Sequence, residues 1–375
     1  MRIAIIGCGQ LAAMMGRAAK QLCLEVSFLA DPFEDRVCIS DLGRVVVRSQ
    51  GSDASSLYLA LGQPDVVTVE KEEVDVQLLE ALAEFCPVKP SPLAIASTQN
   101  RALEKKALQA LELPVVEYRH VWNYDEIVGA VEALGLPVII KSCRSGYDGK
   151  NQWRIESHEQ LQALADQLQQ LECVVERCVN LLAECSLIGV RTAEGDLRTY
   201  PLTENQHSCG ILHRSQVPVS AHLTRHEAEA QKWLGWLMDA FDYVGVMTME
   251  CFVTDQGLVI NELAPRVHNS GHWTLDGAEC SQFENHIRAI CGLPLGSTAL
   301  RAPSVMLNIL GPARCPDEHA AGEGTDIEST VYWYGKASRA GRKLGHINFC
   351  ADNLAAIQRA EADWHTKKSM LQTAS

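Results

Sequence analysis

Short apolar runs and amphipathic runs alternate through the first part of the chain. The apolar runs predict strands at Arg2–Gly7, Glu25–Ala30 and Asp65–Val69, and the amphipathic runs predict helices at Gln10–Leu22, Ser52–Leu61 and Val76–Phe85. Strands that alternate with helices are typical of a parallel, doubly wound sheet. We therefore expect an α/β domain over residues 1–97. Its first strand-to-helix turn contains Gly7 and Gly9, and these glycines fit a tight turn as well as they fit a ligand site.

A second region begins with a helix rich in Lys and Glu. Its predicted elements are the helix Thr98–Leu111, the strands Leu136–Lys141, Gln152–Ile155 and Cys173–Glu176, and the helix His158–Gln170. These elements make a small α+β module over residues 98–178. The third region, residues 179–375, carries long strands and a helix at Arg225–Phe241. A chain of 375 residues suits two or three packed domains of this kind.

The composition is that of a globular protein and limits the classes of partner. Apolar residues make up 47% of the chain and charged residues 21%, as large cores require. The net charge of −14 argues against nucleic acid as the main partner, because that contact depends on clustered Lys and Arg. No apolar run approaches the roughly 20 residues of a membrane-spanning helix, and no signal-peptide pattern begins the chain. We therefore expect a cytoplasmic protein with no membrane partner and with reduced cysteines.

The most informative stretch is a predicted hairpin with two carboxylates. Its parts are the apolar strands Val246–Thr254 and Leu258–Leu263 and the three-residue loop Asp255-Gln256-Gly257. If Thr254 faces Leu258, then Glu250 lies directly opposite Glu262. Like charges in that position destabilise a sheet unless something neutralises them, and such oxygen ligands suit Mg²⁺ that bridges nucleotide phosphates. The alternative is a pair of solvated edge residues, which the apolar character of both strands disfavours.

A lysine and a glycine-bearing loop precede this hairpin and suit a phosphate. Lys141 ends an apolar run, so we expect its ammonium group to emerge at a site. The loop that follows carries Gly146 and Gly149 without a hydrophobic anchor, and its backbone N–H groups can wrap phosphates. Phosphoryl transfer depends mostly on positioning and charge neutralisation, which these parts supply. The chain has neither a P-loop nor the kinase catalytic-loop signatures, so these parts predict a magnesium-ATP site outside those two classes.

Several stretches together resemble the ATP-grasp superfamily, and within it the bicarbonate-dependent ribonucleotide synthetases of purine biosynthesis. The resemblance is carried by Gly7-Cys-Gly-Gln-Leu11, Gly146-Tyr-Asp-Gly149, Gly245–Val253, Asn261–Trp273 and Gly341–His346. It implies an ATP-grasp fold with an N-terminal pre-ATP-grasp domain, and a homodimer. It also implies that ATP, bicarbonate and 5-aminoimidazole ribonucleotide give the N-carboxylated ribonucleotide, ADP and phosphate through carboxyphosphate, with Mg²⁺ as the cofactor.

The resemblance further assigns residues to each ligand. For ATP it implies contacts from Arg101, Lys141, Gly146, Tyr147, Asp148, Gly149, Gln152, Glu176, Val179, Glu184, His207, Asn261 and Glu262. For magnesium it implies Glu250 and Glu262. For the ribonucleotide it implies Gln10, Leu11, Glu70, Asn269, Lys336, Arg342 and Lys343, of which the last three would form a basic pocket for the phosphate. The implied catalytic residues are Arg266, His268 and Lys336, with the first two on the bicarbonate side.

Two other enzyme classes compete with this assignment. A formate-dependent enzyme that formylates glycinamide ribonucleotide shares the overall plan, but His268 and Asn269 after Arg266 favour bicarbonate. A nicotinamide oxidoreductase is suggested only by the N-terminal glycines, and it leaves the opposed glutamates without a role. The residues that depart from the family pattern replace glycines at Cys8, Ala12, Ser145 and Asn151. These departures bear on loop flexibility and not on the class of reaction.

Overall fold

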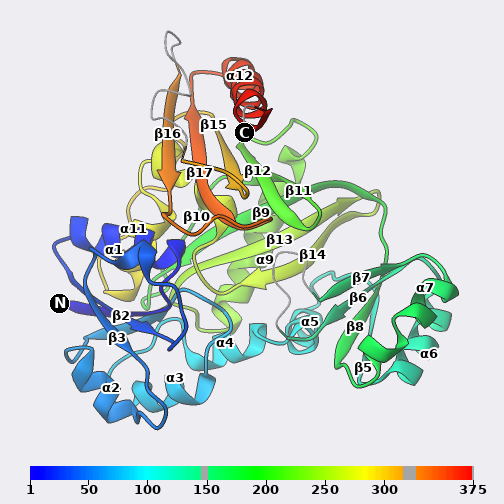
Figure 1. Ribbon diagram of the computed structural model, residues 1–375, viewed down its shortest axis with the longest axis horizontal. Coiled ribbons are helices and arrows are strands. Elements are labelled where there is room, and N and C mark those ends of the chain that lie inside the picture. The colour runs from blue at the N-terminus through cyan, green and yellow to red at the C-terminus, as the bar shows by residue number, and fades with distance from the viewer. Residues whose placement is uncertain (145–150, 316–326, 374–375) are drawn as a thin grey trace.

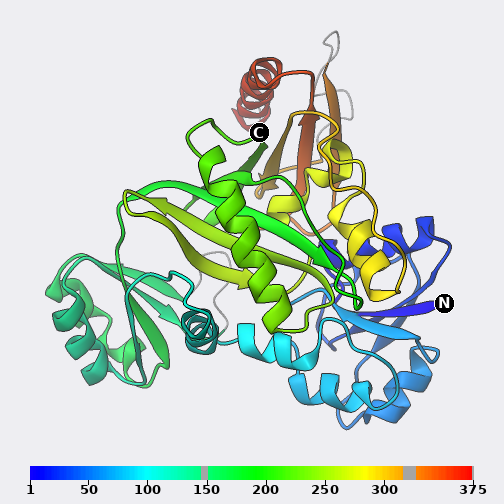
Figure 2. The ribbon, with the colours of Figure 1, turned by 180° about the vertical axis from the view of Figure 1, so that it is seen from behind.

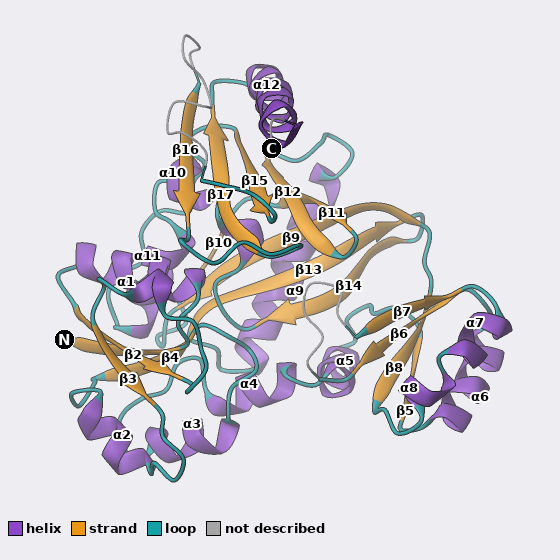
Figure 3. Cartoon of the chain, in the orientation of Figure 1, coloured by secondary structure: helices purple, strands orange, loops and turns teal. Residues whose placement is uncertain are grey.

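The computed structural model describes residues 1–144, 151–315 and 327–373. The chain forms three β-sheets with flanking helices, and the large sheet lies between the N-terminal sheet and a small sheet at the far end (Figure 1). Figure 3 shows that most helices lie beside the two smaller sheets, whereas long strands of the large sheet are not covered by helices in this view. Among the described residues, no helix combines the length and the apolar character needed to cross a membrane.

The N-terminal sheet is parallel, which confirms the prediction from alternating strands and helices. Its strand order is β3 (Arg44–Val47), β2 (Glu25–Ala30), β1 (Arg2–Ile6) and β4 (Val66–Val69). Its helices are α1 (Gln10–Gln21), η1 (Val37–Ile39), α2 (Ala54–Ala60) and α3 (Val76–Ala83). Because Ile6 pairs with Val69, the residues that follow these strands, Gly7 and Glu70, lie side by side at the carboxyl edge of the sheet.

The connection to the rest of the chain consists of two short helices, α4 (Pro92–Thr98) and α5 (Arg101–Ala110). The prediction of one continuous helix over Thr98–Leu111 is therefore wrong. Asn100 separates the two helices as the N-cap of α5, where its Oδ1 accepts hydrogen bonds from the backbone N–H groups of Ala102 at 2.9 Å and Leu103 at 3.2 Å. The break places Arg101 in the first turn of α5.

The small sheet is antiparallel and has helices on its outer face (Figure 1). Its strand order is β5 (Tyr118–Val121), β8 (Cys173–Arg177), β6 (Val138–Ser142) and β7 (Gln152–Ile155). Its helices are α6 (Tyr124–Leu134), α7 (His158–Ala163) and α8 (Ala165–Leu168). The predicted single helix over His158–Gln170 is wrong, because Leu164 leaves helical geometry with φ −100° and ψ 3°.

The large sheet has nine strands. The main path runs through β14 (Gly257–Ala264), β13 (Gly245–Thr254), β9 (Leu181–Arg191), β11 (Thr203–Ser208), β12 (Ile211–Val217), β15 (Ser304–Leu310), β17 (Lys343–Cys350) and β16 (Glu328–Trp333), and β10 (Leu197–Thr199) pairs with β9. Its helical segments are η2 (Thr224–His226), α9 (Glu227–Ala240), η3 (Asn269–Gly271), α10 (Thr274–Gly277), α11 (Gln282–Ile290) and α12 (Leu354–Thr373). Helix α9 covers one face of β9 and β13 (Figure 2), and α11 packs on α1 in a shared core that joins this sheet to the N-terminal one.

Candidate active site

The predicted hairpin is formed by β13 and β14, and Glu250 pairs with Glu262 across it. The register that we expected is nevertheless wrong. Thr254 pairs with Gly257 and not with Leu258, so the loop between the paired strands has two residues and not three. That difference alone would leave the two glutamates out of register by one position.

A β-bulge at Asn261 restores the pairing, because β14 holds one extra residue there. Successive side chains of a regular strand point to opposite faces. Here Asn261 Oδ1 accepts a hydrogen bond from Lys141 Nζ at 3.1 Å, and the next residue, Glu262, accepts from Arg101 Nη1 at 2.8 Å. The bulge therefore brings an amide and a carboxylate to the same group of cations.

The two opposed carboxylates differ in their electrostatic surroundings. Burial raises the pKa of Glu250 to about 7, and the negative charge of Glu262 contributes to the rise. Burial also opposes ionisation of Glu262, but the charges of Arg101 and Lys141 outweigh it and hold the pKa of Glu262 below its ordinary value. A hard divalent cation beside Glu250 would supply the positive charge that favours its ionised form. The opposed oxygen donors, of which Glu250 is buried and Glu262 is partly exposed, therefore fit Mg²⁺.

Two buried lysines and one glutamate lie next to the hairpin. Lys141 Nζ is 2.7 Å from Glu176 Oε2, and Lys105 Nζ is 2.8 Å from Glu176 Oε1. The Lys105 contact is an ion pair without the alignment of a hydrogen bond. Burial opposes the charge on Glu176, but the two ammonium groups outweigh it and lower its pKa to about 2. Lys141 is 5% exposed, so its charge faces this cluster and not a free surface.

Our sequence analysis missed Lys105. Its signal is its position four residues after Arg101, which places both side chains on one face of α5. That signal cannot be separated from an ordinary helix surface without the tertiary structure. Packing against the small sheet leaves Lys105 only 1% exposed and makes it the second cation of the Glu176 cluster.

The other residues predicted for ATP lie on both sides of this cluster. Nδ1 of His207 donates to Oε2 of Glu184 at 2.5 Å. Burial lowers the pKa of His207, but the bond to Glu184 and the charge of Glu250 outweigh burial and raise it. Val179 lies between β8 and β9, and Gln152 begins β7 opposite Lys141. The loop residues Gly146, Tyr147, Asp148 and Gly149 lie outside the described residues, so their role stays a prediction.

Arg266 follows the hairpin and connects it to the N-terminal sheet. Its Nη2 is 2.6 Å from Oε1 of Glu72, which lies just after β4. The charge of Arg266 also lowers the pKa of Glu70 and of Glu262 against the effect of burial. The structure therefore brings this predicted catalytic arginine between the opposed glutamates of the hairpin and the edge of the N-terminal sheet. Sequence reasoning singled out Glu70 and missed Glu72, which holds the guanidinium.

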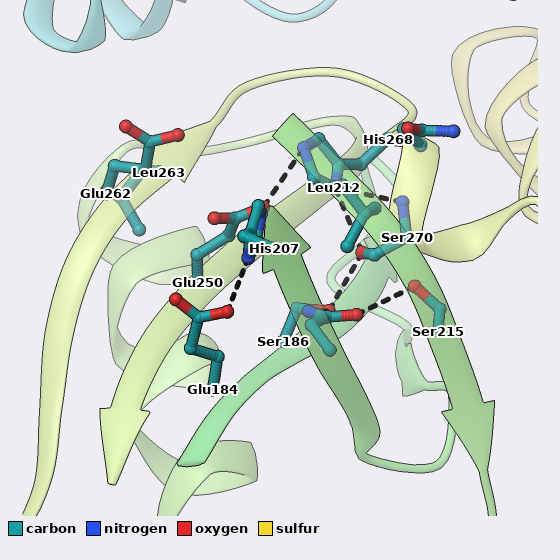
Figure 4. Close-up of polar contacts among 12 residues, drawn as sticks. Glu184, Ser186, His207, Leu212, Ser215, Glu250, Glu262, Leu263, His268 and Ser270 are labelled. Atoms are coloured by element: carbon teal, nitrogen blue, oxygen red, sulfur yellow. Dashed lines mark hydrogen bonds and ion pairs between the residues drawn. The ribbon is translucent and has the colours of Figure 1, made fainter. Parts of the chain in front are cut away.

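His268 lies on the other side of Glu250, with its Nε2 3.2 Å from Glu250 Oε1 (Figure 4). Burial, with a contribution from the charge of Arg266, keeps the pKa of His268 well below its ordinary value, so the ring is neutral. The next residue, Asn269, exchanges side-chain hydrogen bonds with Asn308 at 3.1 and 2.6 Å. Its amide is therefore held in a buried pair with Asn308.

The residues predicted for the ribonucleotide gather at the carboxyl edge of the N-terminal sheet. Gln10, the first residue of α1, accepts a hydrogen bond from Lys336. Glu70 is 8% exposed, and burial raises its pKa although Arg266 and Lys336 oppose the rise. The side chain of Leu11 is part of the hydrophobic core, so only its backbone N–H can serve a ligand.

The residues predicted for the basic pocket lie at the start of β17 and just before it. Arg342 Nη2 donates to Asp35 Oδ2 at 3.1 Å, and its charge acts on Lys336, so these two cations lie near each other. Lys343 begins β17, and its charge acts on Glu250 and His268. The charge of Lys343 therefore acts at Glu250, whereas Lys336 bonds Gln10 and Arg342 bonds Asp35 of the N-terminal domain.

Comparison with known proteins finds matches along most of the chain. Three family descriptions match in order: a ribonucleotide synthetase preATP-grasp domain over residues 1–99, an ATP-grasp domain over residues 106–283, and a phosphoribosylaminoimidazole carboxylase C-terminal domain over residues 304–360. The N5-carboxyaminoimidazole ribonucleotide synthase of Pseudomonas aeruginosa is 39% identical over 364 residues, which are 97% of this chain and 98% of the relative.

Solved structures give the same result. The N5-carboxyaminoimidazole ribonucleotide synthetase of Thermus thermophilus matches with a TM-score of 0.87 and 36% identity, covering 96% of this chain and 97% of its own. The N5-carboxyaminoimidazole synthase of Aspergillus clavatus, solved in complex with ADP and the 5-aminoimidazole ribonucleotide, matches with a TM-score of 0.85 and 29% identity, covering 97% of this chain and 98% of its own.

Proposed function

The chain belongs to the N5-carboxyaminoimidazole ribonucleotide synthase family of ATP-grasp ligases, and we propose that it carboxylates 5-aminoimidazole ribonucleotide with bicarbonate and ATP in purine biosynthesis. The names of its relatives support the ribonucleotide as substrate and do not favour the formate-dependent alternative. One observation carries the choice of bicarbonate. The hairpin with Glu250 and Glu262 leads directly into Arg266 and His268, so a cation and a neutral donor lie beside the carboxylates that suit a metal–nucleotide complex.

The chemistry explains why ATP is consumed. An oxygen of bicarbonate attacks the γ-phosphorus of ATP, and the bond to the β–γ bridging oxygen breaks to release ADP. The product, carboxyphosphate, carries phosphate as a leaving group on the carboxyl carbon. The exocyclic amine of the ribonucleotide then bonds to that carbon, phosphate departs, and the amine loses one proton. Catalysis of the first step rests on placing the two anions in line and neutralising their charge.

The residues of the nucleotide side are suited to that task. Lys141 and Lys105 lie on either side of Glu176 and hold positive charge in a buried place. In this proposal Lys141 faces the phosphates of ATP. Glu176 and Val179 contact its adenine, and Glu184 contacts its ribose. Glu250 and Glu262 would hold Mg²⁺, which supplies charge neutralisation on the phosphate oxygens when bound. Arg101 keeps Glu262 ionised and so ready for a cation.

The residues of the acceptor side have complementary roles. Arg266 is held by Glu72 and offers a guanidinium to the bicarbonate oxygens. His268 offers a neutral N–H beside Glu250. On the ribonucleotide side, Lys336 and Arg342 supply cations for the phosphate, and Glu70 with Gln10 supplies oxygen acceptors for the amine and sugar. ATP and the ribonucleotide, which are both anionic, would then approach Arg266 from opposite sides.

Three further features belong to the same proposal. We infer that the protein works in the cytoplasm and as a homodimer, as the resemblance to its family implies. We also infer three domains, residues 1–97, 98–178 and 179–375, each built around one of the three sheets. Light scattering on a sizing column measures the oligomeric state, and a mass of one chain, 41.2 kDa, would exclude the dimer.

A substrate panel tests the reaction. The purified protein is given ATP and Mg²⁺ with either bicarbonate and 5-aminoimidazole ribonucleotide or formate and glycinamide ribonucleotide, and ADP formation is measured. We expect turnover with the first pair, and we expect label from ¹³C-bicarbonate in the ribonucleotide product. Equal or faster turnover with formate and glycinamide ribonucleotide would overturn the assignment.

A further inference from the structure

A row of polar side chains crosses one face of the large sheet. Ser186 on β9 pairs directly with Glu250 on β13, and Asn205 on β11 pairs directly with Ser215 on β12. β11 also pairs with β9, so the four residues lie on adjacent strands. Ser186 and Ser215 are fully buried and Asn205 is 4% exposed. Polar groups in such a position cost free energy unless each finds a partner.

Each of these groups does find a partner, and the bonds form one continuous chain. Ser215 Oγ is 2.8 Å from Asn205 Oδ1, Asn205 Nδ2 is 2.9 Å from Ser186 Oγ, and Ser186 Oγ is 2.8 Å from Ser270 Oγ. Ser270 Oγ is 2.9 Å from His268 Nδ1, and His268 Nε2 is 3.2 Å from Glu250 Oε1. Figure 4 shows the chain leaving the sheet at Ser186, rising to η3 and returning to Glu250.

The direction of every bond follows from one fixed group. The backbone N–H of Ser270 can only donate, and it donates to His268 Nδ1 at 3.2 Å. Nδ1 is therefore an acceptor, and the neutral ring carries its proton on Nε2, facing Glu250. The hydroxyl of Ser270 must then donate to Nδ1 and accept from Ser186. The amide of Asn205 donates to Ser186 and accepts from Ser215, so all five side-chain donors point the same way.

We propose that Ser270, Ser186 and Asn205 are positioning residues that hold His268 as the Nε2–H tautomer aimed at Glu250. The other tautomer would turn a lone pair of Nε2 toward the carboxylate and would leave a proton on Nδ1 facing the N–H of Ser270. Both contacts would be repulsive, so the chain of hydrogen bonds selects the tautomer of His268 as well as the orientation of its ring. This inference rests on the proposed role of His268 at the acceptor side of the site.

The chain of hydrogen bonds also explains why the residues of this row are polar on all four strands. A single serine beside His268 could rotate its hydroxyl away from Nδ1. The hydroxyl of Ser270 is fixed because Ser186 donates to its oxygen, and Ser186 is fixed in turn by the amide of Asn205. Removing one member leaves a buried donor or acceptor unpaired and frees the next hydroxyl to turn.

The test compares Ser186→Ala with a matched control, Ser27→Ala. Ser27 is also a buried strand serine, but its hydroxyl bonds a backbone carbonyl in the N-terminal sheet. We expect Ser186→Ala and Ser270→Ala to lower kcat for ribonucleotide carboxylation about tenfold, with the KM for ATP little changed, because groups that orient a catalytic side chain commonly cost about 10- to 100-fold. Ser27→Ala should leave kcat unchanged.

A double-mutant cycle separates positioning from general damage. If Ser186 acts through His268, Ser186→Ala in a His268→Asn background should lower kcat no further. Side-chain ¹⁵N shifts of histidine, with the His268 signal identified by its loss in His268→Asn, should show the Nε2–H tautomer in the wild type and a mixture in Ser186→Ala. Additive losses of kcat, or an unchanged His268 signal in Ser186→Ala, would overturn the positioning role. Full activity of His268→Asn itself would instead overturn the proposed role of His268, so the two failures are distinct.

Discussion

Arg101 donates to Glu262 at 2.8 Å, which joins the first turn of α5 to the hairpin of β13 and β14. Burial opposes the charge on Glu262, but Arg101, with contributions from Lys141 and Arg266, holds the pKa of Glu262 below its ordinary value. The structure thereby holds a negative charge ready for a cation while the opposite carboxylate, Glu250, keeps a pKa of about 7. Both ends of the pair come from segments that sequence analysis selected, but their contact spans two domains of the proposed division.

Glu262→Gln should remove the negative charge that is available to a metal ion, and most of the activity should be lost with it. We expect magnesium-dependent ADP formation to fall by about a hundredfold or more, because a metal ion contributes several kcal/mol of charge stabilisation in such reactions. The amide keeps the shape of the side chain, so the thermal unfolding midpoint should stay close to that of the wild type. Asp255→Asn, at the exposed tip of the same hairpin, is the control and should keep full activity. Wild-type turnover in Glu262→Gln would remove the hairpin from the mechanism.

Asn100→Ala tests whether the break between α4 and α5 positions Arg101. The variant loses an N-cap and should be less stable by about 1 kcal/mol, as is usual for caps. It should also raise the KM for ATP, because Arg101 is the next residue and its backbone N–H bonds the carbonyl of Cys143 at 3.0 Å. Asp53→Ala removes the N-cap of α2, which is far from the site. The two variants should lose similar stability in urea unfolding, and only Asn100→Ala should lose affinity for ATP. Equal KM values in both would show that the cap serves stability alone.

Lys105→Met tests a cation that sequence reasoning did not select. The change removes one of two ammonium groups from Glu176 and leaves an apolar chain of similar length in a buried place. We expect the KM for ATP to rise about tenfold or more, since removing one partner of a buried ion pair commonly costs about 3–5 kcal/mol, and part of that loss should fall on the nucleotide site. Lys106→Met, at the neighbouring exposed position, should behave as the wild type. Lys105→Arg should restore part of the affinity if charge and not shape is what ATP requires.

The sequence was sufficient for features that depend on local pattern. The parallel N-terminal sheet follows from alternating strands and helices, and the hairpin follows from two apolar strands around a turn, whereas the opposition of its two glutamates depends on the bulge. The bulge at Asn261 was not predictable, because its extra residue is stabilised by Lys141, a partner distant in the chain. The cap at Asn100 did have a local signal, since Asn is a preferred N-cap, but an unbroken run of helix-forming residues around it masked the break.

The polar row of the large sheet shows more clearly what could not be predicted from the sequence. Ser186, Asn205 and Ser215 lie on three strands, and nothing in the segment of each marks it as a partner of the other two. Only the register of β9, β11 and β12 brings them into one chain of hydrogen bonds. Residues that touch a ligand could be assigned by resemblance, whereas residues that orient them through register could not.

His286 should make stability depend on pH below neutrality. It is fully buried on α11, where its Nδ1 accepts from the N–H of Val246 at 3.0 Å and its Nε2 lies 2.8 Å from Oγ1 of Thr68, so it joins β13 to β4. Burial lowers its pKa from 6.5 to about 4, so between these values the unfolded chain binds a proton that the folded chain excludes. The stabilisation is complete above pH 6.5 and is lost as pH falls toward 4, by roughly 3 kcal/mol at about 1.4 kcal/mol per pKa unit.

Urea unfolding at a series of pH values should give a smaller loss in His286→Asn than in the wild type, whereas His158→Asn, an exposed position on α7, should follow the wild type. Parallel curves for the wild type and His286→Asn would show that this histidine is not excluded from protonation in the folded state.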